Sequence, residues 1–145
     1  FIPVFKETFG RLFGNPRNLR SRDLAKIVRM LPSDLPTSLI MQFADWYEGD
    51  GFASSEGGFS YIDKLDRITA PTQLIVGEDD KLAPPEDIQF IFDQLSADQK
   101  RIEILGVASG CRFDYGHVDP VLGKWAPEEV WPLFDEWIEM TTHLQ

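Results

Sequence analysis

The feature that most constrains the fold is an alternation of strand-like and helix-like segments in the second half of the chain. Residues 72–76, Thr-Gln-Leu-Ile-Val, form a short apolar run that stops at Gly77, as a buried parallel strand does. Two prolines and two acids at residues 84–87 open a helix. Residues 101–105 read as a second strand, and Ala126 precedes a final helix. The order strand, helix, strand, helix predicts an α/β fold with a parallel sheet packed by helices.

Each of these two helices is expected to have one apolar side. The side of the first is formed by Ile88, Ile91, Phe92 and Leu95. The side of the last is formed by Val130, Trp131, Phe134, Trp137 and Ile138, and we interpret its aromatic stripe, Trp131, Phe134 and Trp137, as core packing. Pro132 is predicted to kink the last helix near its start.

Two parallel strands do not make a stable sheet alone, because such strands are buried on both faces and need neighbours. We therefore expect residues 66–145 to be the C-terminal part of a larger α/β core. The first residue is Phe1 rather than Met, and we expect the remaining strands to lie outside the 145 residues.

The first part of the chain, residues 1–65, is predicted to be a helical cap segment. Its best helix starts at Thr37 or Ser38 and carries a one-sided apolar stripe. A shorter helix capped by Ser21 holds Leu24, Ile27, Val28 and Leu31 at helical spacing. A glycine-rich loop is expected over residues 49–58.

Composition excludes several classes of function. The net charge of −10 disfavours nucleic acid as a partner. A single cysteine, Cys111, and two histidines give no metal-binding cluster, and we expect neither a metal nor another cofactor. The longest apolar runs fall far short of the roughly 20 residues of a transmembrane helix.

Two loops are expected to carry chemistry, because open α/β sheets place functional groups beyond the C-terminal ends of their strands. Residues 77–82 supply carboxylates, and residues 114–119 contain His117. A carboxylate bonded to one imidazole nitrogen fixes the tautomer and leaves the other nitrogen as a base for a nucleophile.

The same two segments resemble the α/β-hydrolases, and in particular the acid lipase and esterase branch. Residues 71–88 match the run P-T-x-x-x-x-G-x-x-D-x-L-A-x-P-x-D-[VI] that is typical of the acid segment there. Residues 115–119, Tyr-Gly-His-Val-Asp, with Ala-Pro-Glu-Glu-Val at 126–130, are similar to its histidine segment. The order acid then histidine is that of the family.

The resemblance implies a serine hydrolase that acts on apolar carboxylic esters or lipids, with Asp80 as the triad acid and His117 as the general base. Asp79 competes for the role of the acid, and a shift of one residue points its side chain elsewhere. Further aromatic residues, expected in the substrate pocket, are Trp46, Phe59 and Tyr61.

The chain departs from the family in lacking a G-x-S-x-G elbow and an oxyanion-hole loop. Neither Ser60 nor Ser109 has the elbow spacing, and Cys111 is a nucleophile only if a base lies beside it. We expect the N-terminal half of the fold, on the same or a separate chain, to supply the nucleophile, and these residues alone to be inactive. Two alternatives stay open: a Cys or Asp nucleophile, as in polyester synthases, dehalogenases or epoxide hydrolases, or a non-catalytic half-domain that binds a partner.

Overall fold

The computed structural model describes residues 11–23, 25, 36–49, 51–54 and 58–142. Its centre is a pair of parallel strands, β1 (Thr72–Gly77) and β2 (Lys100–Leu105), in a register that sets Thr72 opposite Lys100 and Gly77 opposite Leu105. The predicted α/β class with a parallel sheet is confirmed. Among the described residues the sheet has these two strands alone, which is too few to define a particular α/β family.

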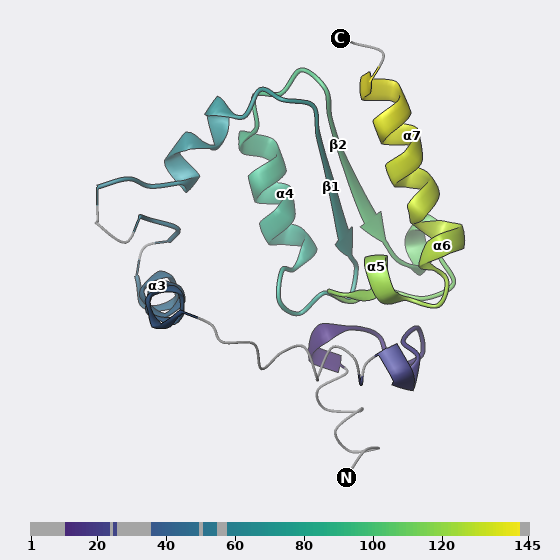
Figure 1. Ribbon diagram of the computed structural model, residues 1–145. Helices are drawn as coiled ribbons and strands as arrows, with labels where there is room; N and C mark the ends of the chain where they lie inside the picture. The colour runs from purple at the N-terminus through teal and green to yellow at the C-terminus, as the bar shows by residue number, and fades with distance from the viewer. Residues whose placement is uncertain (1–10, 24, 26–35, 50, 55–57, 143–145) are drawn as a thin grey trace.

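Helices cover both faces of the strand pair. Helix α4 (Pro85–Gln94) lies on one side, and α6 (Ala126–Glu129) and α7 (Trp131–Thr142) lie on the other (Figure 1). On the α4 side, the Lys100 ammonium donates to the carbonyls of Phe92 and Leu95 at 2.9 and 2.8 Å, where the helix ends. On the other side, the side chains of Gln73 and Arg101 donate to the carbonyl of Leu133.

The last helix is divided rather than kinked at Pro132. Helix α6 ends at Glu129, Val130 has φ −117° and ψ −46°, and α7 starts at Trp131. Pro132 thus occupies the first turn of α7, where backbone N–H groups have no partner within the helix, so the missing N–H of proline costs no hydrogen bond. Pro132 is the second residue of α7, and the break at Val130 precedes it by two residues.

The interpretation of the aromatic stripe of α7 as core packing is wrong for Trp131 and Phe134. Trp131, Phe134 and Ile138 are 47, 36 and 58% exposed. Leu133 packs against the core, and the Trp137 ring lies 5.5 Å from the Arg101 guanidinium. Helix α7 therefore has two apolar sides, and the described residues cover one of them.

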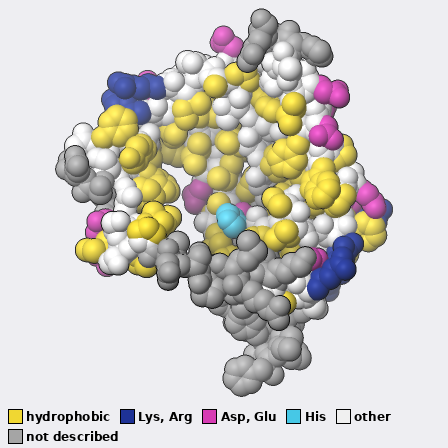
Figure 2. Space-filling model, in the orientation of Figure 1, with side chains coloured by type: hydrophobic (Ala, Val, Ile, Leu, Met, Phe, Trp, Pro, Cys, Tyr) yellow, Lys and Arg dark blue, Asp and Glu magenta, His cyan; other side chains and the backbone are white. Residues whose placement is uncertain are grey.

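The strands are half-buried where a complete sheet would enclose them. Only the C-terminal ends are fully buried, at Val76, Gly77 and Leu105. The buried core, Leu105, Tyr115, Ala126 and Val130, lies at that same end. Figure 2 shows hydrophobic side chains gathered on the surface in front of the strands and their flanking helices.

Residues before β1 form helix α3 (Thr37–Glu48), a pair of extended segments and η1 (Ile62–Arg67). The extended segments meet in an antiparallel bridge between Ala53 and Ser60, so the predicted glycine-rich loop is partly ordered as a hairpin. Of the short helix predicted from Ser21, residues 21–23 and 25 are helical, whereas Leu24, Ile27, Val28 and Leu31 lie outside the described residues, as do residues 1–10.

The long connection after β2 contains η2 (Val107–Ser109) and α5 (Asp119–Leu122). Strands and helices are arranged so that both strands point toward α5 and toward residues 11–23 (Figure 1). In the described part of the chain, no helix combines the length and the apolar character needed to span a membrane.

Candidate active site

The acid loop follows β1 and fixes the Asp80 carboxylate by local bonds. Oδ1 of Asp80 accepts the backbone N–H groups of Leu82 and Ala83, each at 2.9 Å. An aspartate that bonds its own backbone two and three residues on forms a tight turn, so the turn and the carboxylate hold each other. The side chain is 5% exposed, and its second oxygen, Oδ2, points away from the turn's N–H groups to a different partner.

The neighbouring carboxylate, Asp79, faces outward. Its Oδ1 lies 2.6 Å from the Lys81 ammonium, and both side chains are at least half exposed. The Asp79 carboxylate raises the pKa of Lys81 through this contact. The one-residue difference between the two aspartates therefore separates a buried carboxylate from a solvated one.

The histidine loop is joined to the acid loop through the backbone of Tyr115. The Tyr115 N–H donates to the carbonyl of Leu105, and the Tyr115 carbonyl accepts from the Asp79 N–H at 2.9 Å. The buried Tyr115 hydroxyl donates to Oε2 of Glu129 at 2.7 Å. Burial is the largest cause that raises the pKa of Tyr115, and the Glu129 carboxylate adds to it. Tyr115 thus anchors the loop to α6, to the end of β2 and to the acid loop.

The two loops bring Asp80 and His117 into contact. Nδ1 of His117 lies 2.9 Å from Oδ2 of Asp80. When Oδ2 of Asp80 accepts this hydrogen bond, Nδ1 carries the proton and Nε2 is left as the basic nitrogen. The imidazole is 44% exposed while the carboxylate is 5% exposed, so a reactant can reach the ring and the acid is largely shielded from solvent. The arrangement can take a proton from a hydroxyl or thiol placed at Nε2.

A second buried carboxylate, Asp119, lies two residues beyond the histidine. Its Oδ2 accepts the backbone N–H groups of Asn15 and Gly116, each at 2.8 Å. Burial raises its pKa to about 6, and these two hydrogen bonds act in the opposite direction. The sequence places Asp119 in the histidine motif but does not predict its burial or its hydrogen bonds, because its partner Asn15 is 104 residues away.

An apolar cavity of about 560 Å³ lies between η1 and α4. Residues from the hairpin, η1, the acid loop and α4 line it, among them Phe52, Tyr61, Leu65, Leu82, Ile88 and Ile91. Leu82 belongs to the turn that holds Asp80, so the cavity borders the acid loop directly. A volume of this size is typical of pockets for small ligands.

The three aromatics expected at a substrate pocket are placed differently from one another. Tyr61 lines the cavity. The centroid of the Phe59 ring lies 5.2 Å from that of the Tyr61 ring. Trp46 donates its indole N–H to the Ala53 carbonyl at 2.7 Å and contacts Phe52, which does line the cavity. Trp46 and Phe59 thus contact residues of the cavity wall and are not themselves among the lining residues. Their part in substrate binding stays a prediction.

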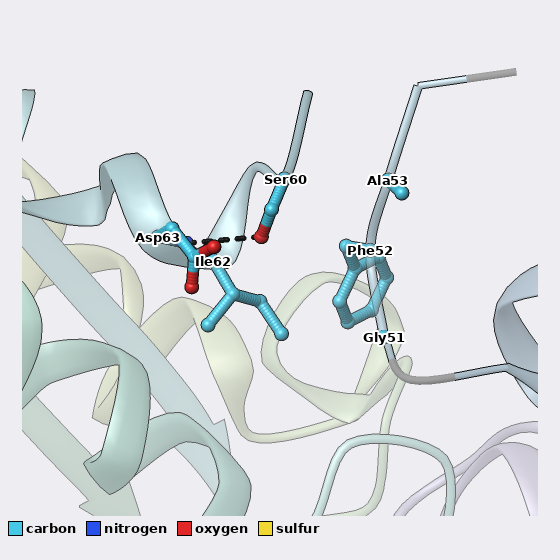
Figure 3. Close-up of a pocket in the computed structure, with 6 residues that line it drawn as sticks. All are labelled: Gly51, Phe52, Ala53, Ser60, Ile62 and Asp63. Carbon is cyan, nitrogen blue, oxygen red and sulfur yellow. Dashed lines mark hydrogen bonds between the residues drawn. The ribbon is translucent and has the colours of Figure 1, made fainter. Parts of the chain in front are cut away.

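The hydroxyl of Ser60 is engaged away from the Asp80–His117 pair. It accepts the backbone N–H of Asp63 at 3.2 Å, at the start of η1, and it borders a smaller cavity opposite Phe52 (Figure 3). Ser109 bonds the backbone of Gly106 within η2. Cys111 lies 4.0 Å from that Ser109 hydroxyl, and burial raises the pKa of its thiol, which disfavours the reactive thiolate.

Among the described residues no cluster of three or more His, Cys, Asp or Glu side chains has a metal-binding arrangement. His143 lies outside those residues. Comparison with known proteins adds no relative: no protein-family model, no curated protein and no solved structure matches the chain.

Proposed function

We propose that these residues are the C-terminal part of an α/β-hydrolase that cleaves carboxylic esters and that they supply its triad acid and its histidine. The observation that carries the proposal is the 2.9 Å contact between Nδ1 of His117 and Oδ2 of Asp80. Both residues hold the positions of the family's motifs, and both lie beyond the C-terminal ends of parallel strands, where α/β proteins carry their sites.

In the proposed reaction, a serine from outside the 145 residues attacks the ester carbonyl. Nε2 of His117 accepts the serine proton and later returns it to the leaving alcohol. Asp80 accepts the hydrogen bond from Nδ1, orients the ring and stabilises the imidazolium that forms. The two N–H groups of Leu82 and Ala83 hold Oδ1 of the carboxylate, which leaves Oδ2 directed at the ring.

The cavity beside the acid loop supports the proposed substrate class. Its lining is aliphatic and aromatic, with one carboxylate, Asp87, at the wall. A hydrocarbon chain gains about 25 cal/mol for each Å² of apolar surface it buries there, whereas an anionic group would meet the repulsion of Asp87. This favours the acyl chain of a neutral ester over a free fatty acid.

The rest of the fold is proposed to cover the open apolar surface. The half-buried strands and the exposed side of α7, formed by Trp131, Phe134 and Ile138, are the surfaces that further strands and helices of an α/β core would bury. The same exposure favours the second candidate, a half-domain that completes another chain without catalysis. A cysteine or aspartate nucleophile would use the same histidine and acid.

The test is ester hydrolysis by the complete gene product that carries these residues, with p-nitrophenyl esters of increasing acyl length. We expect His117→Ala and Asp80→Asn to lower kcat by about 10⁴-fold, because each destroys the relay. Asp79→Asn is the matched control and should keep most of the activity, since Asp79 faces solvent.

A fluorophosphonate probe distinguishes the remaining candidates. Labelling of a serine, detected by intact mass, supports the ester hydrolase. Unaltered ester hydrolysis in Asp80→Asn would rule out the triad assignment. If the native chain is found to start near Phe1 and neither labels nor hydrolyses esters, the non-catalytic half-domain replaces the hydrolase.

A further inference from the structure

Asp119 is buried at the histidine loop, yet the proposed chemistry gives it no part. It is 0% exposed, although it carries a carboxylate. Burial of an acid is unfavourable unless its oxygens accept hydrogen bonds. Both bonds that it accepts, from Gly116 and Asn15, go to the same oxygen, Oδ2, at 2.8 Å.

The first of these bonds closes a hydrogen-bonded turn of the backbone that contains the histidine. The Gly116 N–H donates to the Asp119 side chain, and the Asp119 N–H donates back to the Gly116 carbonyl at 3.2 Å. His117 lies inside this four-residue turn. Because the turn is bonded in both directions, the backbone of His117 is held, and with it the direction in which the imidazole leaves the chain.

The second bond fixes the turn to a distant part of the chain. Asn15 donates its N–H to Asp119, and the neighbouring Val118 N–H donates to the Phe13 carbonyl at 2.7 Å. Gly14 approaches so closely that a Cβ atom on it would lie 2.5 Å from Oδ1 of Asp119. Residues 13–15 and the histidine turn are therefore packed as one unit, with the carboxylate between them.

We propose that Asp119 is a positioning residue that holds His117 in the orientation in which Nδ1 faces Asp80. Its effect on catalysis rests on the proposed function, whereas its effect on the imidazole does not. The imidazole of His117 is positioned by the acceptor oxygen of Asp119, because the N–H groups of Asn15 and Gly116 need a partner inside the protein. The negative charge is not required, and burial already raises the pKa of this carboxyl to about 6.

This reasoning selects two variants that differ in one property. Asp119→Asn keeps a carbonyl oxygen of the same reach, so both backbone N–H groups keep their acceptor. Asp119→Leu has similar volume and no acceptor, so the N–H groups of Asn15 and Gly116 are left buried and unpaired. Asp119→Ala, with a smaller side chain, serves if the Leu variant fails to fold by circular dichroism.

The experiment is two-dimensional NMR of the imidazole nitrogens in the ¹⁵N-labelled chain, with His143 as the internal reference. We expect one Nδ1–H tautomer for His117 in the unaltered protein and in Asp119→Asn. In a folded Asp119→Leu or Asp119→Ala variant, the Nδ1–H tautomer should be lost or mixed with Nε2–H. A folded acceptor-free variant with an unchanged tautomer overturns the proposal, and so does a folded Asn variant that loses it.

Kinetics of the complete gene product separate this proposal from the function it serves. Asp119→Leu should lower kcat by about 10²-fold, the effect of a small misplacement of a catalytic group, with little change in KM. Asp119→Asn should restore most of kcat. If the tautomer responds as expected while no form hydrolyses esters, the positioning role stands and the proposed function fails.

Discussion

The loop after β1 and the loop after β2 meet at one contact but are held by different kinds of interaction. Asp80 in the first loop is fixed by N–H groups two and three residues further along the chain. His117 in the second loop is held through Asp119, whose partner Asn15 is 104 residues away. One loop is stabilised by its own sequence, and the other depends on a distant segment that must be in place.

Because the two loops are held differently, Asp80 and His117 can lose their positions through different changes in the chain. A short loop loses little conformational entropy on closure, so the acid is ready once β1 and α4 have formed. The histidine loop also needs residues 13–15, because Phe13 and Asn15 bond its Val118 N–H and its Asp119 carboxylate. We therefore expect changes in the N-terminal segment to affect the histidine and to leave the acid as it is.

The largest effect is expected where the two loops touch. A Cβ atom on Gly77 would collide with the Tyr115 carbonyl, which is backbone and cannot turn aside. Gly77→Ala should therefore lower the free energy of unfolding by about 3 kcal/mol in urea denaturation and disturb both loops. The control is Gly58→Ala, where a Cβ atom meets nothing within 4 Å and the change should stay within about 0.5 kcal/mol. Equal stability of the two variants would show that the loops are not in contact.

The next effect is a dependence of stability on pH that comes from the histidine loop. Burial raises the pKa of Asp119 from 3.8 to about 6. Between these values the folded protein keeps a proton that the unfolded chain has released, so the free energy of unfolding falls as pH rises. The contribution of Asp119 is fully present below about pH 4 and is lost through pH 6, a change of about 3 kcal/mol.

Urea denaturation at pH 4, 5, 6 and 7 measures this contribution as the difference between the unaltered protein and Asp119→Asn. The amide does not titrate, so the curve of that variant should lack the fall. If both proteins show the same slope between pH 4 and 6, the pH dependence does not come from Asp119.

A smaller loss is expected when the anchor of the histidine loop on α6 is removed. Tyr115→Phe deletes the hydroxyl that donates to Glu129 and leaves that carboxylate without this donor. Hydrogen bonds to charged groups contribute about 2 kcal/mol, and thermal denaturation should show a loss of that order. Tyr61→Phe, on the exposed hairpin, is the control and should be nearly neutral. A neutral Tyr115→Phe would mean that the strand contacts alone hold the loop.

The smallest effect tests most directly whether the two loops are held independently of each other. Asn15→Ala removes a side-chain donor to the Asp114 carbonyl at 2.8 Å and keeps the backbone bond to Asp119. We expect a loss of about 1 kcal/mol, with amide shifts that change at residues 114–119 and not at residues 80–83. Gln89→Ala, which removes an exposed amide on α4, should change neither set. Equal shifts in both loops would contradict the comparison.

The same contrast explains what the sequence could predict. Strands β1 and β2 and helix α4 were predicted within one or two residues, because an apolar run, a glycine stop and a proline pair are local signals. The turn around Asp80 is equally local. The choice of Asp80 over Asp79 as the catalytic acid stays a prediction, although the structure turns only Asp80 toward the histidine.

What the sequence could not predict depends on contacts between distant residues. The link from Asn15 to Asp119 and the bond from Tyr115 to Glu129 join elements whose pairing no local pattern encodes. The exposed side of α7 was misread for a related reason. Helical spacing shows that Trp131 and Phe134 share a side with apolar neighbours, but it does not show which partner covers that side.

The two-stranded sheet has a consequence for amide hydrogen exchange. In parallel strands, successive backbone amides point to opposite edges, so about half of those in β1 and β2 face away from the partner strand. Amides between the strands should exchange slowly with deuterium, and those on the outer edges quickly, while no further strand is bound. Slowing confined to one outer edge would then identify which strand receives a new neighbour, residue by residue, before that neighbour is known.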